Sequence, residues 1–462
     1  MYARIVPIIP IIIMVFIIAP DANASLTADL KSGILPNIAT DTGNALINSG
    51  IYPKAFFDDT LYGNAAGGVR REAIVFHEAY FGADLDMNRI AGLSGTIVRF
   101  AVDSRFGGNP QGVNDMAGSG VSYFHGSGPN NQTRLTQLEI EEHLADDRLR
   151  VSVGRMQLSS FFATSRYYCL FQLGMCANLN PMTWSSNSDA PFWPVSVWAG
   201  EMTVIPRRNT YLRFGGEESN STQYYNGGFP WGDGWSLHGA SGAHVMIEAG
   251  YETADSSRLP GRYDVGAYED TSPVGNFRYD ANGGRIAFTH DAGRMQSGQN
   301  GIYAQFEQTV WHPRRGQQLL TLLGGLVFDT SGHSLQKNYF LLGFIWEGLF
   351  PGHRHDFLAF KATEHHLNRN ATDYLDDEIM ASGRSGRMST HEQTLEADYS
   401  IRLVAGVRLT PFAAFIFHPD QQVYTITQPN PKITHSFSGG LQLSFSLGEA
   451  AGLTPFGLSR PY

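Results

Sequence analysis

SFSGGLQLSFSL, residues 436–447, is the stretch that decides the fold of this chain. Large apolar residues stand at alternate positions, interrupted once by Gly439, and serine, glutamine or glycine stands between them. Successive side chains of a β-strand point to opposite faces, so this stretch predicts a strand with one apolar and one polar face. A soluble sheet can use such a strand with its apolar face on a core, whereas a membrane barrel uses it on every strand, with that face toward lipid.

The same alternation recurs along most of the sequence. Between residues 395 and 403, apolar side chains alternate with Glu396, Asp398, Ser400 and Arg402. Burying that second face in a dry core would be prohibitively costly, so it must meet water. Predicted strands cover residues 50–61, 73–85, 95–103, 135–144, 149–155, 244–252, 263–268, 284–290, 301–311, 319–328, 338–349, 356–364, 395–403, 407–417 and 436–447.

A single closed barrel accounts for these segments without leaving an exposed sheet edge. The sequence therefore predicts an all-β protein, a transmembrane antiparallel β-barrel of about 16 strands. A soluble protein built from several β-sandwiches would need linkers between domains, and the sequence shows none. Connections such as 353–355 and 330–336 are short, and 107–132, 158–194 and 368–394 are long. Outer-membrane barrels have short periplasmic turns and long external loops, which we expect here.

The first 24 residues have the layout of a secretory signal peptide. Arg4 precedes an apolar run over 5–19, and Ala22, Asn23 and Ala24 form a small-x-small cleavage site. The run is too short for a membrane helix and contains Pro7 and Pro10. We expect a short N-terminal segment over 25–48, the barrel over 49–448, a tail over 449–462, and export to the bacterial outer membrane.

Composition fits this class. The mean hydropathy of -0.20 does not exclude a barrel, because alternating strands average to neutral hydropathy. The 51 glycines and 29 phenylalanines suit many turns and aromatic girdles. A net charge of -10 argues against nucleic acid as a partner.

The two cysteines, Cys169 and Cys176, lie in the connection 158–194. In an exported chain, a close pair of this kind indicates one disulfide that closes a short loop. A redox pair would have Cys-x-x-Cys spacing, and a metal site would need further ligands nearby. The disulfide and the aromatic residues predict that this connection is ordered and folds inward to narrow the lumen. The alternative is a surface cap packed on its neighbours.

Several motifs follow one another in a fixed order. They are LINSGI (46–51), YGNAAGGVRREA (62–73), GADLDM (82–87), Gly154-Arg155, the cysteine loop, PFWP (191–194), LPGRYDVG (259–266), GIYAQFEQ (301–308), PGHRHD (351–356) and EADYS (396–400). Together the motifs resemble those of the carbohydrate-selective (OprB-type) outer-membrane porins, over about residues 46–447.

The resemblance implies a sixteen-stranded barrel that passes sugars such as glucose by passive diffusion, with no cofactor and no covalent chemistry. Outer-membrane lipid, small sugars and the barrel assembly machinery are the expected partners, and both a monomer and a homotrimer fit. The chain departs from the pattern at its end. Residues 438–445 resemble the terminal assembly signal, but the chain continues from Gly448 to Tyr462.

Solutes in such a barrel meet only inward side chains, so these must set its selectivity. Sugars offer hydroxyl groups and flat apolar ring faces, which suit charged or amide groups beside aromatic rings. Mixed signs of charge argue against a strong ion filter. The predicted pore-lining residues are Arg99, Asp103, Arg150, Phe192, Trp193, Glu248, Glu307, Lys361, Asp398 and Arg402, with Trp193 and Phe192 as stacking contacts and Arg99 as a hydrogen-bonding contact.

Three other functions were weighed: a barrel enzyme such as a lipid hydrolase, a general non-selective porin, and a plugged receptor barrel. The sequence has neither the Gly-x-Ser-x-Gly motif of a nucleophile elbow nor the His-Glu-x-x-His spacing of a zinc site. A receptor would need a large N-terminal plug, and only about 25 mature residues precede the first predicted strand. We therefore expect no enzyme activity, no catalytic residues, no cofactor and no metal. The histidine patches at 353–355 and 365–366 are read as solvated.

Overall fold

The computed structural model describes residues 34–108, 111–124, 132–174, 178–179, 183–184, 187–224, 234–254, 257–313, 318–351, 353–422 and 428–450. The expected signal peptide, residues 1–24, lies outside them, as does most of the expected tail. The strands are β1 (Ile51–Gly67), β2 (Ala73–Asp86), β3 (Thr96–Gly107), β4 (Gln132–Leu144), β5 (Leu149–Met156), β6 (Val197–Arg207), β7 (Thr210–Ser219), β8 (Gly242–Glu252), β9 (Gly261–Asp280), β10 (Gly293–Trp311), β11 (Leu319–Asp329), β12 (Gln336–Glu347), β13 (Phe357–Leu367), β14 (His391–Val404), β15 (Val407–Phe417) and β16 (His435–Ser446).

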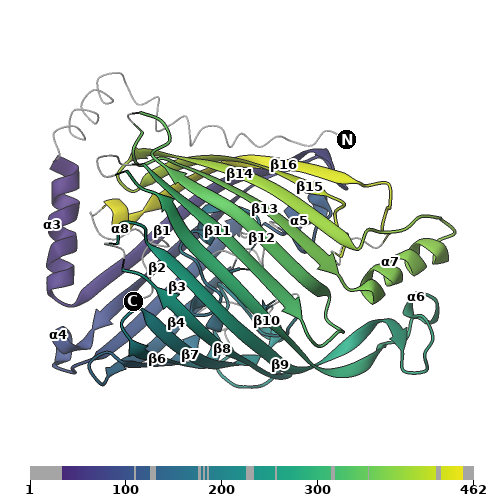
Figure 1. Cartoon of the computed structure of the whole chain (residues 1–462), viewed down its shortest axis with the longest axis horizontal. Coiled ribbons are helices and arrows are strands. Elements are labelled where there is room, and N and C mark those ends of the chain that lie inside the picture. Colours follow the sequence, from purple (N-terminus) through teal and green to yellow (C-terminus); the bar gives the residue numbers. More distant parts are fainter. Residues whose placement is uncertain are drawn as a thin grey trace.

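These strands form one closed antiparallel barrel (Figure 1). Each strand pairs with its neighbour in the sequence, and β1 pairs with β16 to close the sheet, with Leu61 opposite Leu441. The predicted fold class, an all-β barrel of about 16 strands, is confirmed. No helix among the described residues is long and apolar enough to cross a membrane.

The stretch over 436–447 has the two faces that its alternation predicts. Phe437, Leu441 and Phe445 are exposed on the outer face of β16, while Ser436 and Ser438 are buried on the inner face. The outer face of the other strands is likewise apolar, with exposed residues such as Phe81, Ile140, Val153, Val265, Ile302, Leu342 and Leu395. The wall therefore presents hydrocarbon outward and polar groups inward around its circumference.

The two ends of the barrel differ (Figure 1). At one end, the short-turn end, β6–β7 and β14–β15 are joined by residues 208–209 and 405–406, and the helices α3 (Ile34–Asn48), α4 (Met87–Ala91) and α8 (Leu447–Ala450) lie there. The opposite end, the long-loop end, has the connections 108–131, 157–196, 220–241 and 368–390. They include α5 (Gln111–Ala117), the 3-10 helices η1 (Leu158–Ser160), η2 (Tyr168–Leu170) and η4 (Ser221–Tyr224), and α7 (Arg369–Ala381), with α6 (Ile286–Thr289) between β9 and β10.

Strands β6 and β7 were not predicted from the sequence. Their alternation is interrupted by Pro206 in β6 and by Gly215 and Gly216 in β7, where two consecutive glutamates also precede the last residue. Tertiary pairing with β5 and β8 forms these strands in spite of the broken pattern.

The predicted strand over 284–290 is wrong. The Asp280 side chain accepts hydrogen bonds from the backbone N–H groups of Asn282 and Gly284 and from the Thr289 hydroxyl, at 2.8–2.9 Å. These bonds hold the chain in a turn that leads into α6. Local side-chain bonding of this kind competes with strand pairing.

A helix lies in the connection over 368–394, where only a loop was expected. The Asn368 side chain caps α7 by accepting from the N–H of Asn370, and Ala371, Leu375 and Ile379 form its buried stripe. Asp377 of α7 pairs with Arg278 of β9 at 2.8 Å and with Arg285 at 2.9 Å. Because Arg285 lies in the connection between β9 and β10, this ion pair joins that connection to the one between β13 and β14, outside the barrel.

Leu342, midway along β12, tests the outer face. It is 63% exposed, and we predict that Leu342→Arg lowers the free energy of unfolding by about 2–4 kcal/mol, because the guanidinium would face the bilayer midplane. The measurement is denaturant unfolding of the barrel in lipid vesicles, with Leu342→Ala as the matched control. Equal unfolding free energies for the two variants would contradict a lipid-facing position.

Candidate functional site

The connection between β5 and β6, residues 157–196, is what we call the inner segment, and its described residues lie inside the barrel. The Tyr168 hydroxyl donates to the Gln305 side chain of β10 at 3.0 Å. Buried residues of the inner segment, including Leu158, Phe162, Phe171 and Trp184, form one apolar cluster with inward residues of β8–β13 such as Met246, Tyr303, Leu323, Tyr339 and Phe357. The predicted inward course of this connection is therefore observed, and the surface cap is not.

Inward carboxylates of the wall bind the main chain of the inner segment. Glu217 of β7 accepts from the N–H of Leu158 at 2.7 Å and from the Trp184 indole at 2.9 Å. Glu396 of β14 accepts from the N–H groups of Gln172 and Leu173, at 2.6 and 2.9 Å. Because a buried N–H without a partner costs about 1–3 kcal/mol, these carboxylates make the inward course energetically possible.

Two further wall carboxylates also accept hydrogen bonds from main-chain N–H groups of the inner segment. Glu248 of β8 accepts from the N–H of Ala163 at 2.8 Å, and Asp270 of β9 accepts from the N–H of Asp189 at 2.9 Å. The inner segment is thus fixed at both of its ends and between them. Lys361 complements the carboxylates, because its ammonium donates to the carbonyl of Leu173 and pairs with Glu396 at 3.0 Å.

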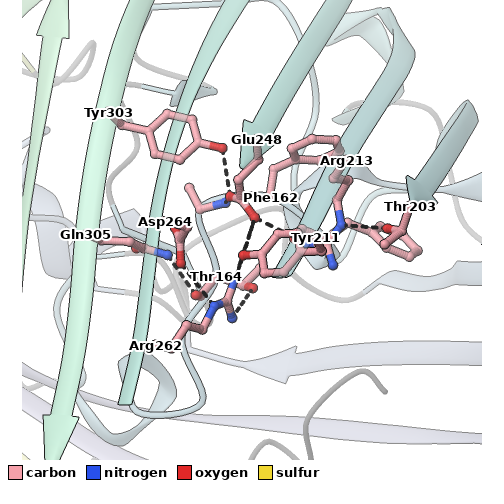
Figure 2. A network of polar contacts seen from close by, with 12 residues as sticks. Phe162, Thr164, Thr203, Tyr211, Arg213, Glu248, Arg262, Asp264, Tyr303 and Gln305 are labelled. Carbon is pink, nitrogen blue, oxygen red and sulfur yellow. Dashed lines mark hydrogen bonds and ion pairs between the residues drawn. The ribbon is translucent and has the colours of Figure 1, made fainter. Parts of the chain in front are cut away.

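Glu248 is the centre of a wider polar network (Figure 2). The hydroxyls of Tyr211 and Tyr303 each donate to its carboxylate at 2.8 Å. Arg213 and Arg262 lie 3.4 and 3.6 Å from Oε1 of Glu248, the oxygen that also accepts from Tyr211, and both arginines are buried. Glu248 is 0% exposed, so its partners are protein groups and it has no surface to offer to a solute.

Two more connections meet inside the long-loop end. The Asp420 carboxylate, between β15 and β16, accepts from the N–H groups of Gly120 and Val121, the latter at 2.7 Å. Glu392 of β14 accepts from the N–H of Asp420 at 2.8 Å. Burial raises the pKa of Asp420 to about 6, above its ordinary value, so its contribution to stability falls as the pH rises through about 6.

The inner face of β1–β4 at the short-turn end has a second kind of site, in which charged side chains are partly exposed. Arg99 lies within 3.5 Å of Asp84, 3.1 Å of Glu139 and 2.6 Å of Glu141. Lys54 pairs with Asp84 at 2.6 Å. The Arg99 side chain is 13% exposed and Lys54 27% exposed, so both are held in place and yet can be reached by water.

Aromatic rings lie next to these charges. The ring of Trp193 is 5.2 Å from that of Tyr80, which stacks on Phe56 at 5.2 Å. The Trp193 indole N–H points to Glu78 at 3.4 Å, and Glu78 is bound by Arg105 at 2.8 Å. Trp193, Phe192 and Phe56 are partly exposed, and they form what we call the aromatic row together with Tyr80.

The predicted pore-lining residues fall into two groups. Glu248, Lys361, Asp398 and Asp103 are buried, and the first two bind the inner segment. Glu307 is buried as well and lies 3.9 Å from Arg166. The partly exposed group comprises Arg99 on the wall, Phe192 and Trp193 of the inner segment, Arg402, which pairs with Glu449 at 2.9 Å, and Arg150, which pairs with Asp147 in the β4–β5 turn. The hydrogen bond from Arg150 lowers the pKa of Asp147.

Several residues of these sites were not predicted. Glu78 and Arg105 follow the same alternation as Arg99 and could have been found from it. Glu217 lies in a strand that the sequence analysis missed, and Arg166 lies in the inner segment, which has no periodicity to show its direction.

Cys169 lies in the inner segment and is disulfide-bonded. The other cysteine of the sequence, Cys176, lies outside the described residues, as do 175, 177, 180–182 and 185–186 of the same segment. The predicted pairing of the two cysteines stays a prediction.

Comparison with known proteins gives one family. A family model described as carbohydrate-selective porin, OprB family, matches residues 70–446. A predicted porin of Acinetobacter baylyi, QuiX, is 24% identical over 361 residues, which cover 73% of this chain and 77% of that protein. The structure of Pseudomonas putida OprB at high pH superimposes with a TM-score of 0.76 at 22% identity, covering 88% of this chain and 96% of that one. Its low-pH structure gives a TM-score of 0.51 at 17% identity, covering 88% and 95%.

Glu217 tests whether wall carboxylates hold the inner segment. We predict that Glu217→Ala leaves the barrel folded but loosens the segment, because the buried N–H groups of Leu158 and Trp184 lose their acceptor, at about 1–3 kcal/mol each. The measurements are proteolysis within 157–196 and single-channel conductance, and both should rise. Glu142→Ala is the control, because Glu142 accepts from Thr96 on the wall. Unchanged proteolysis and conductance in Glu217→Ala would show that this carboxylate does not anchor the segment.

Proposed function

Since this chain belongs to the carbohydrate-selective porin family OprB, we propose that it lets small neutral sugars diffuse across the outer membrane past the aromatic row and the charges around Arg99. The observation that carries this proposal is the position of Trp193. Its ring is partly exposed, backed by Tyr80, and oriented by the bond from its indole N–H to Glu78. A fixed ring with charged groups on either side suits a pyranose, which has apolar faces and a rim of hydroxyls.

The charges supply the polar half of the contact. Arg99 has five N–H donors, and Asp84, Glu139 and Glu141 share them in a fixed arrangement. Side chains held by such ion pairs lose little further entropy when a sugar hydroxyl replaces a water. Lys54 and Arg99 carry positive charge, and the three carboxylates beside them carry negative charge. A site with charges of both signs favours neutral polar solutes over either cations or anions.

The inner segment narrows the route in this proposal. Its largest apolar cluster lies against β8–β13, and Leu173 packs with Tyr62 of β1, Phe76 of β2 and Phe412 of β15. The route that we propose passes the aromatic row, Lys54 and Arg99, where side chains stay partly exposed. Binding there is weak, because conduction requires release as well as entry. We infer a passive channel with no catalytic residues, exported by its signal peptide and folded into the outer membrane by the barrel assembly machinery.

The protein is an outer-membrane protein by family and fold. A homotrimer surrounded by outer-membrane lipid is the assembly that we propose. A general porin without sugar preference is the second candidate function. It is favoured by partly exposed charges away from the aromatic row, such as Arg150 and Arg402.

Trp193→Ala separates the two candidates. We predict that the variant binds glucose about fivefold more weakly, because a stacking contact is worth about 1 kcal/mol. Binding is measured as the decrease in ion current through single channels in a planar bilayer as glucose is added. Trp198→Ala is the matched control, since Trp198 is 41% exposed on the outer face of β6. If glucose reduced the current equally in both variants and in the unsubstituted protein, the aromatic row would have no part in recognition, and the general porin would be favoured.

Arg99→Gln tests the charge balance of the lumen. The substitution leaves Asp84, Glu139 and Glu141 without their shared cation. One unit charge at ~8 Å in a mostly aqueous pore is worth about 0.5 kcal/mol, so the permeability ratio of potassium to chloride should rise about two- to fivefold. The measurement is the reversal potential in a potassium chloride gradient. Arg285→Gln is the control, because Arg285 pairs with Asp377 of α7 at the long-loop end, outside the barrel. An unchanged ratio in Arg99→Gln would place Arg99 away from the conduction route.

A further inference from the structure

Three potential metal ligands meet on the outer face of the barrel, near the long-loop end. Glu364 and His366 are two residues apart in β13, so their side chains share one face of the strand. His391 is the first residue of β14 and stands opposite His366 in the strand register. His365, between the first two, is buried on the inner face and lies 2.8 Å from the Gln336 side chain, so the cluster is separate from the lumen.

The atoms that could bind a metal are close together. Nε2 of His366 lies 2.8 Å from Oε1 of Glu364, and Nδ1 of His391 lies 3.2 Å from the same oxygen. All three ligand atoms lie within 4.8 Å of one another, and the two imidazole rings are 4.1 Å apart. Tetrahedral zinc with ligands at ~2.0–2.1 Å separates them by about 3.3 Å, so small side-chain movements would complete the geometry.

The surroundings also suit a metal. The Asn338 amide lies 3.5 Å from Nδ1 of His366, and its oxygen, if turned toward the ring, would accept the ring N–H and leave Nε2 free for the metal. The side chains of Glu364 and His391 are 41% and 45% exposed, so an ion can enter from solvent. Three protein ligands leave a fourth position open for water or an anion.

The simpler interpretation is a surface cluster in which each histidine donates one N–H to Glu364. The geometry also suits a metal, because two imidazole nitrogens and a carboxylate oxygen lie close together on one face of the sheet. A metal bound by two neutral imidazoles and a carboxylate uses all three groups.

We propose that Glu364, His366 and His391 form a binding site for zinc or a similar divalent transition metal. The sequence analysis expected no metal and treated the histidine patches as solvated. His391 is far from His366 in the sequence, and only the pairing of β13 with β14 brings them together. A bound ion links these two strands at the end where α7 joins them.

The test is metal binding by the full barrel in detergent, purified without a polyhistidine tag. Titration with Zn²⁺ against a chromophoric chelator should give one site per chain, and Co²⁺ should give the visible absorption of a four-coordinate nitrogen–oxygen site. Glu364→Gln, His366→Ala and His391→Ala should each raise the dissociation constant at least about tenfold. His435→Ala, an exposed histidine on β16, should leave it unchanged.

Each variant is first checked for its folded barrel by its shift in electrophoretic mobility on heating. Zn²⁺ should also raise the unfolding temperature of the unsubstituted barrel and of His435→Ala, but not that of His391→Ala. The proposal is overturned if the unsubstituted protein binds less than one equivalent at micromolar Zn²⁺, or if the three cluster variants bind as tightly as His435→Ala. Neither measurement depends on sugar transport.

Discussion

The structure depends on one constraint, which is that a long stretch of non-repetitive backbone inside a barrel must find hydrogen-bond partners. Some main-chain N–H groups of the inner segment bond within the segment, as in η1 and η2. Others donate to wall carboxylates on β7, β8, β9 and β14. Glu248 and Glu396 also have partners on the wall, which are Tyr211 and Tyr303 for the first and Lys361 for the second, so each links the segment to the wall.

This arrangement divides the lumen into two regions with different roles. Against β8–β13 the interior is packed with apolar side chains from the inner segment and the wall, as in the core of a soluble protein. Along β1–β4, Lys54, Arg99 and Trp193 keep part of their surface free. The proposed path for sugars lies along the second region, and the first gives it a rigid opposite side. Charge inside the barrel holds a folded loop at Glu217 and Glu396, and we propose that it meets the solute at Arg99.

Alternation in the sequence was sufficient to predict the barrel, the apolar outer face and the inward direction of most charges. It could not separate Arg99, which meets water, from Glu248, which is fully buried, because both occupy inward positions of regular strands. Whether an inward side chain is buried depends on where the inner segment lies, and the irregular sequence of that segment does not show its position. Strands β6 and β7 escaped detection because glycines and a proline interrupt their period, and α7 because it lies within a long connection.

Local sequence patterns also do not show which residues of different strands become neighbours. His366 and His391 become neighbours only because β13 pairs with β14, and Glu217 meets Trp184 only because the inner segment turns inward. The family resemblance supplied the expected solute class, which alternation alone does not give, since porins of many selectivities share the same two-faced strands.

Hydrogen exchange over the inner segment in the folded barrel tests the central claim most directly. If the wall carboxylates hold the segment, the N–H groups of Leu158, Ala163 and Leu173 should exchange as slowly as those of the neighbouring strands, because each is buried and bonded. Exchange at the rate of an unprotected loop, while β8 and β14 stay protected, would contradict the account.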